Sequence, residues 1–214
     1  MTQQTDTETI MHVEKSGMMS RRMTHTKWAG LGLALLLPFV QSIWGVHSTL
    51  HESLEWTGYF LVVIGVFGRV WCSAYIGGRK NYELIDIGPY SIVRNPLYVF
   101  SFLIVSGVAL ATGMVTVMLL VQILYAAYYR LVIEREEAAL LEAYGAAYAD
   151  YLKRVPRWLP RPGLWREPGE ITVRPRFLYL TLRDIGWVVL LLPAIEAIDT
   201  IQGAGWLPVL LHLP

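Results

Sequence analysis

The side chains best suited to chemistry in this sequence are charged residues at the two ends of one long uncharged stretch. Arg94 precedes the stretch 97–129, which contains no formal charge, and Glu134, Glu136 and Glu137 follow it. Arginine and carboxylate groups form charge-assisted hydrogen bonds, which are stronger than bonds between neutral groups. A set with both signs of charge matches a ligand that is itself zwitterionic.

The first polar cluster is the segment 88–98, which reads Gly-Pro-Tyr-Ser-Ile-Val-Arg-Asn-Pro-Leu-Tyr. Asn95 is a favourable N-cap and Pro96 a favourable first helical residue, so the pair predicts that a helix begins here. For this segment alone, Arg94 is equally well explained as a positive anchor at a membrane surface.

The second cluster is the segment 130–137, in which a helix is expected to leave the membrane. Arg130 and Glu134 are four residues apart on one helix face, and Glu137 continues that face. Carboxylates are unfavourable anchors beside anionic lipid head groups, which favours a binding role. A solvated helix face is the alternative.

The third cluster covers residues 144–156 and ends in Val-Pro. Tyr144, Tyr148 and Tyr151 fall on one stripe of a predicted helix. Taken alone, such a stripe is more typical of packing or interface anchoring than of binding.

These clusters belong to a chain whose composition indicates a membrane protein. Hydrophobic residues make up 54% of it and charged residues only 16%, whereas soluble domains carry about 25% charged residues. The net charge of +1 gives no basic field, so we expect no nucleic-acid partner. Cys72 is the one cysteine, which excludes an intramolecular disulfide and a cysteine-rich metal site.

A membrane-spanning helix needs about 20 mostly apolar residues. The sequence predicts an all-α fold, a polytopic integral membrane helical bundle of about five transmembrane helices. The two middle helices form a hairpin that turns at Thr112-Gly113, and the last helix has a re-entrant or interfacial alternative. The expected spans are 28–46, 56–76, 97–111, 114–133 and 185–195, the last extending toward 201.

The charges predict the orientation of this bundle. Three segments expected in the cytoplasm, 1–27, 78–96 and 130–184, hold 17 of the 18 lysines and arginines. The positive-inside rule therefore places the N-terminus and the polar clusters on the cytoplasmic side. We expect a multi-pass protein of the cell inner membrane. We expect a cytoplasmic tail at 1–27 and two N-terminal spans at 28–76. A core at 77–162 would contain the hairpin and the cytoplasmic binding segment, and a loop with a C-terminal span would follow at 163–214.

In this order, the three clusters resemble the isoprenylcysteine carboxyl methyltransferase and phospholipid methyltransferase family of integral membrane enzymes. That family reads Gly-x-Tyr, Arg-His-Pro-x-Tyr, a helical hairpin, an Arg with paired Glu residues, Gly-x-x-Tyr-x-x-Tyr and a Val-Pro exit. The resemblance covers about residues 77–160. Asn95 stands where the family has histidine, and asparagine cannot act as a general base.

The resemblance implies S-adenosylmethionine as methyl donor and a membrane lipid or lipidated molecule as acceptor, with a prenylcysteine-like carboxylate or a lipid head group accepting the methyl. No metal is needed, since aligning donor and acceptor is the main task. Without the histidine, an oxygen acceptor is slightly favoured over an amine, which must first lose a proton. We assign catalytic roles to Arg94 and Glu137. The expected cofactor-binding residues are Tyr90, Arg94, Asn95, Pro96, Tyr98, Arg130, Glu134, Glu136, Glu137 and Tyr148.

Arg69 supports a different class of function. It lies inside the second expected span, where an arginine is costly and often marks an ion or solute pathway. A small transporter or channel subunit is therefore the alternative, and a structural scaffold is a third. In either an enzyme or a transporter, we expect Arg69 to face the helix bundle or a polar cavity.

Overall fold

The computed structural model describes residues 37–45, 48–77, 83–167 and 169–214, and these are mostly helical. They divide into two compact units. One unit contains Ile198–His212 together with the described residues up to Gln41. The other contains Ser42–Ala197 and Leu213–Pro214, and it holds all the residues of the candidate site.

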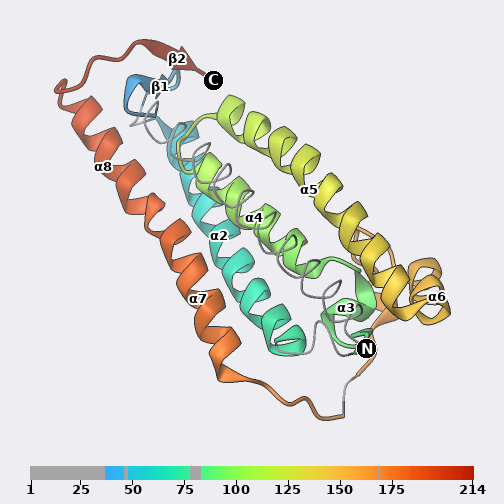
Figure 1. Ribbon diagram of the computed structural model, residues 1–214. Coiled ribbons are helices and arrows are strands. Elements are labelled where there is room, and N and C mark those ends of the chain that lie inside the picture. The colour runs from blue at the N-terminus through green and yellow to red at the C-terminus, as the bar shows by residue number, and fades with distance from the viewer. Residues whose placement is uncertain (1–36, 46–47, 78–82, 168) are drawn as a thin grey trace, which may run out of the picture. The chain divides into compact units, whose positions relative to one another are not determined.

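Helix α2 (Thr49–Ile76) begins at Ser48, whose side chain accepts a hydrogen bond from the His51 amide at 3.2 Å. It packs closely along α4 (Pro96–Leu110), as Figure 1 shows. Glycines permit this approach: a Cβ added at Gly65 would lie 2.8 Å from the Phe100 carbonyl oxygen. Small residues at such contacts are how helices associate closely within a membrane.

The expected helical hairpin is confirmed. Helix α4 is followed by α5 (Val115–Tyr144), and the turn between them falls at Thr112 and Gly113, where Gly113 has a φ of 65°. Figure 1 shows α4 lying between α2 and α5. The Tyr125 hydroxyl donates to the Tyr98 carbonyl oxygen at 2.8 Å and so ties the two arms of the hairpin together.

Helix α5 continues past the expected end of the membrane span at 133, as predicted for the segment 130–137. It reaches Tyr144, where Gly145, with a φ of 53°, ends it and starts the short helix α6 (Ala146–Arg154). A second short helix, α3 (Pro89–Ile92), precedes α4, and a 3-10 helix, η2 (Pro162–Leu164), follows α6. These short elements gather at the end of α5 that lies away from the hairpin turn (Figure 1).

Within the described residues, three helices are long and apolar enough to cross a membrane: Thr49–Ile76, Val115–Tyr144 and Pro175–Gly203. Helix α4 is apolar but has only 15 residues. The described residues are therefore mostly helical with apolar helices suited to a membrane, as predicted, while the count of five spans is not reached among them.

The first expected span, 28–46, lies mostly outside the described residues, and its described part is not an α-helix. Leu37–Phe39 forms a 3-10 helix, η1, and Val40–Ser42 forms strand β1, which pairs with β2 (Leu211–Leu213). The Ile43 amide donates to the Leu213 carbonyl oxygen at 2.9 Å. Proline at position 38 disfavours a continuous helix because it has no amide hydrogen.

The last helical stretch begins ten residues before the predicted start at 185. Helix α7 (Pro175–Val189) and helix α8 (Leu191–Gly203) follow each other directly. The predicted start of the last helix at 185 is therefore corrected to Pro175. Proline suits the first position of α7, and the ring of Pro193 conflicts with the carbonyl four residues earlier, at Val189, where α7 ends.

Candidate functional site

A cavity of about 260 Å³ lies where α2, α4, α5 and α6 meet residues 83–85. It is lined by side chains of both polar and apolar character. Eight of the ten residues predicted to bind a cofactor line it: Tyr90, Arg94, Asn95, Pro96, Tyr98, Glu136, Glu137 and Tyr148. Their binding role stays a prediction, but the fold does bring them to one place.

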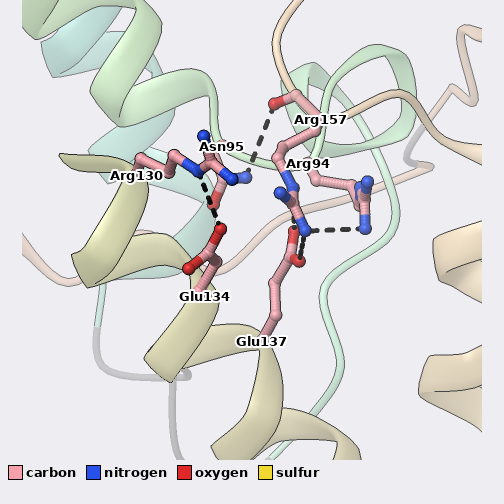
Figure 2. A network of polar contacts seen from close by, with 6 residues as sticks. All are labelled: Arg94, Asn95, Arg130, Glu134, Glu137 and Arg157. Atoms are coloured by element: carbon pink, nitrogen blue, oxygen red, sulfur yellow. Dashed lines mark hydrogen bonds and ion pairs between the residues drawn. The ribbon is translucent and has the colours of Figure 1, made fainter. Parts of the chain in front are cut away.

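Glu137 is the centre of the charged network beside this cavity (Figure 2). One of its oxygens forms an ion pair with Arg94 Nη1 at 3.1 Å and accepts a hydrogen bond from Arg157 Nε at 3.2 Å, and the other accepts from Arg157 Nη2 at 2.5 Å. The Glu137 and Arg94 side chains are only 10% and 13% exposed. Two guanidinium groups thus share one carboxylate, and the network carries a net charge of +1.

This geometry changes the expected role of Glu137. We predicted that it would meet the cofactor directly, yet its two oxygens already accept two hydrogen bonds from Arg157 and form an ion pair with Arg94. Its position suits a different task, which is to hold the Arg94 and Arg157 guanidinium groups in place. The Nε atom of Arg94 is buried and has no partner among the residues that the structure describes.

Backbone hydrogen bonds fix the segment after α6 against the start of α4. The Arg94 amide donates to the Pro156 carbonyl oxygen at 2.8 Å, and the Arg161 amide donates to the Ile92 carbonyl oxygen at 2.9 Å. These bonds explain why Arg157 reaches a glutamate on α5. Sequence reasoning missed Arg157, because its partner lies 20 residues away and in another element.

Asn95 occupies the predicted N-cap position of α4, but its side chain makes no capping bond. Only its backbone carbonyl oxygen caps the helix, accepting from the Tyr98 amide at 3.0 Å. The side-chain Nδ2 instead donates to the Arg157 carbonyl oxygen at 3.5 Å, a long bond (Figure 2). Asn95 therefore ties the two segments of the site together, weakly.

Three buried tyrosines form one wall of the cavity. The Tyr151 hydroxyl donates to the Tyr90 carbonyl oxygen at 2.8 Å, and the rings of Tyr148 and Tyr151 lie 5.7 Å apart. Burial raises the pKa of Tyr148 to about 12 and the pKa values of Tyr90 and Tyr151 well above their ordinary value. All three hydroxyls are therefore neutral at physiological pH, and the buried Tyr90 hydroxyl has no partner within the described part of the chain.

Arg130 and Glu134 were predicted to share the site, but they do not line the cavity. They pair with each other at 3.1 Å on the outside of α5, with side chains 75% and 43% exposed. Helical spacing correctly placed them on one face with Glu137. Burial of that face begins one turn later, where Arg157 reaches the helix.

Arg69 lines the cavity, which confirms the prediction that it faces a polar cavity. Its Nη1 donates to the Ser101 Oγ of α4, and that hydroxyl donates to the Leu97 carbonyl oxygen at 2.6 Å.

A second charged cluster braces the loop before α3. Asp86 accepts from Arg154 at 3.1 Å and from Arg166 at 2.6 Å, both outside the cavity lining. In the portion of the chain that the structure describes, no group of three or more His, Cys, Asp or Glu side chains is placed to hold a metal ion.

Comparison with known proteins identifies relatives of this chain. The family model described as phospholipid methyltransferase matches residues 54–147, so it takes in most of α2 as well as the hairpin. The nickel-cobalt-cadmium resistance protein NccN of Alcaligenes xylosoxydans xylosoxydans is 34% identical over 77% of each chain. The cobalt-zinc-cadmium resistance protein CzcN of Cupriavidus metallidurans is 34% identical over 69% of this chain and 68% of its own. No solved structure matches.

The match with the family model begins 23 residues before the resemblance seen at 77–160, so it includes Arg69 and Ile76 of α2, which line the cavity. With its apolar helices, its hairpin and its ordered clusters, this chain belongs to the phospholipid methyltransferase family of membrane proteins.

Proposed function

We propose that this protein transfers a methyl group from S-adenosylmethionine to a lipophilic acceptor held in the membrane. The observation that carries the proposal is the cavity beside the Arg94–Glu137–Arg157 network, in a chain of a methyltransferase family. The acceptor would be a prenylcysteine-like carboxylate or a lipid head group.

The side chains around the cavity fit the charges of the proposed donor. Its carboxylate matches Arg94, whose guanidinium belongs to a network with an excess positive charge and keeps its buried Nε without a partner among the described residues. Its ammonium and ribose hydroxyl groups match the carboxylate of Glu136, which lines the same cavity beside Tyr98. The neutral Tyr90 hydroxyl offers a further hydrogen-bond donor.

When bound, S-adenosylmethionine supplies an electrophilic methyl group on a positively charged sulfur. The residues of this chain then have to hold that group in line with the acceptor, and alignment alone is worth roughly 7–11 kcal/mol. Asn95 cannot take up a proton. An acceptor oxygen that is already ionised needs no base, which fits this cavity better than an ammonium group does.

The direct test uses the full chain purified in neutral detergent. Calorimetry should show saturable binding of S-adenosylhomocysteine, and tritium from labelled S-adenosylmethionine should appear in a lipid extract incubated with the protein. Failure of the protein to bind S-adenosylhomocysteine would contradict the proposal.

We further propose that the cavity opens to the cytoplasm, because the charge bias places the polar clusters there. A cysteine introduced at Gly163 should resist an impermeant thiol reagent in intact cells, and one introduced at Ser48 should react. Cys72 is buried and gives little background. Labelling of position 163 by the impermeant reagent would show that the protein has the opposite orientation in the membrane.

A second candidate function is a small transporter or channel subunit, and the names of the relatives favour it. Those names refer to resistance against nickel, cobalt, zinc and cadmium, and export is one route to resistance. Arg69 would then line the pathway, but a buried guanidinium repels a metal cation. Cobalt flux into proteoliposomes separates the two functions, since only a transporter should accelerate it.

A further inference from the structure

Arg69 occupies an unusual place for a charged residue. It lies in the interior of α2, seven residues before the last residue of that helix, Ile76, in a segment long and apolar enough to span a membrane. Its guanidinium meets α4 at Ser101, six residues after the N-cap Asn95, which is about 9 Å farther along the helix axis.

Within the described residues, no carboxylate pairs with Arg69. Among the described residues its hydrogen-bond partner is the Ser101 hydroxyl, and its Nε is buried without a partner there. Arg69 also acts electrostatically on Cys72, Tyr125 and Tyr129, and none of these carries a carboxylate. An intramembrane arginine requires a partner or an aqueous pocket, and the cavity that Arg69 lines is where a counter-charge can reach it.

The cavity therefore has two cationic groups with different surroundings. Arg94 shares Glu137 with Arg157 at the end where the short helices gather. Arg69 stands apart from that network, beside the stacked rings of the hairpin, where Tyr125 and Tyr129 lie 4.1 Å apart. The proposed donor has one carboxylate and can satisfy only one of the two.

We propose that Arg69 binds the anionic head group of the methyl acceptor, so that the acceptor is an acidic amphiphile bearing a carboxylate or a phosphate. This inference rests on the proposed function, because it divides one cavity between a donor held by Arg94 and an acceptor held by Arg69. The guanidinium presents its donors in a planar fork that matches either anion. An acceptor of this kind places its apolar chain among the helices and its charge against Arg69.

The test compares three probes with the same alkyl chain: dodecanoate, dodecyl phosphate and the neutral dodecanol. The full chain in neutral detergent is titrated with each probe, and native mass spectrometry gives the bound fraction. We expect the wild-type protein to bind at least one of the anions roughly tenfold more tightly than dodecanol. The better anion then identifies the head group as a carboxylate or a phosphate.

Two variants assign the preference to Arg69. Arg69→Gln should bind the preferred anion roughly tenfold to hundredfold more weakly and lose the preference over dodecanol. Arg69→Lys keeps the positive charge without the planar guanidinium group, and it should retain part of the preference for the anion. Arg183→Gln is the matched control, since Arg183 is an exposed arginine on α7 whose loss changes the net charge equally.

Binding of S-adenosylhomocysteine by the same samples separates this inference from the proposed function. Unchanged affinity for S-adenosylhomocysteine in Arg69→Gln, with loss of anion binding, supports the division of the cavity. If wild-type protein binds S-adenosylhomocysteine but treats the three probes alike, Arg69 only extends its charge to the membrane surface and the inference is wrong. If wild-type protein binds no S-adenosylhomocysteine, the proposed function fails and the acceptor site fails with it.

Discussion

Two polar clusters interrupt the apolar bundle, and they are built differently. Beside the cavity, two guanidinium groups share the single carboxylate of Glu137. Nearer the start of α2, one phenol stands between two carboxyl groups: Tyr59 lies 2.6 Å from Glu55 Oε1 and 2.7 Å from Glu196 Oε1. The first cluster has an excess of positive charge, and two of its residues, Arg94 and Glu137, line a cavity. The second joins α2 to α8 and takes no part in that cavity.

The number of protons in the second cluster determines how its hydrogen bonds are satisfied. A phenol has one proton and can donate it to only one oxygen. The other close oxygen must therefore donate to the phenol, so one of the two glutamates carries a proton. This cluster satisfies its own hydrogen bonds, whereas the cavity keeps buried donors of Arg94 and Arg69 without partners among the described residues. Of these two clusters, the one beside the cavity is therefore the better placed to receive a ligand.

The largest expected effect comes from Glu137→Gln. It leaves two close guanidinium groups without their shared carboxylate, so they repel each other and lose their orientation. Affinity for S-adenosylhomocysteine should fall about tenfold to hundredfold, corresponding to roughly 1.5–3 kcal/mol, and the melting temperature should fall as well. Glu196→Gln is the matched control at the other cluster. Calorimetry showing equal losses in the two variants would remove the distinction between the clusters.

Arg94→Ala should have a similar or slightly smaller effect on affinity. It removes one charge-assisted hydrogen bond to the proposed donor, worth about 1.5–3 kcal/mol, but leaves Glu137 paired with Arg157. The melting temperature should therefore change less than in Glu137→Gln. Unchanged affinity in both variants would leave the proposed function without its binding site.

Arg157 acts through Glu137, so its effect should be smaller. Its side chain is 35% exposed, and solvent weakens ion pairs at that exposure. Arg157→Ala should lower affinity for S-adenosylhomocysteine by about threefold to tenfold, roughly 0.7–1.4 kcal/mol. Arg157→Lys keeps the charge without the two-point contact and should recover part of the loss. A lysine variant as weak as the alanine variant would indicate that geometry, rather than charge, positions Glu137.

The smallest expected effect is that of Asn95→Ala. Its side chain makes one long bond of 3.5 Å and no capping bond, so the loss should stay below the roughly 1 kcal/mol of a typical N-cap. Asn95→His restores the residue typical of the family. A large loss in Asn95→Ala, measured by the same calorimetry, would show that the amide contacts the ligand itself.

The sequence predicted the parts of the fold that local chemistry determines. Proline at position 96 marks the start of α4, and Thr112-Gly113 marks the hairpin turn, because both signals act within a few residues. The early start of α7 was missed because the span was predicted from apolar runs, and charged residues such as Arg176 and Arg183 interrupt the apolar run in this helix.

For the site, ordered clusters predicted most of the cavity lining but not the partners within it. The grouping of Arg130 with Glu137 followed from helical spacing, which says which residues share a face but not what covers that face. Arg157 covers it through a loop whose path depends on backbone bonds to residues near 94. Contacts of this kind do not recur at a regular sequence spacing, so sequence periodicity cannot predict them.

The length of α5 places the site at a definite depth. Its 30 residues measure about 45 Å, which exceeds the roughly 30 Å of a bilayer's hydrocarbon. Glu137 is the twenty-third residue, about 33 Å from the start of the helix. If the helix begins at one hydrocarbon boundary and runs upright, Glu137 lies in the head-group layer of the opposite leaflet. A water-soluble donor can reach that layer from the aqueous side without crossing the hydrocarbon core. An amphiphilic acceptor can reach the same layer while its apolar chain stays in the bilayer.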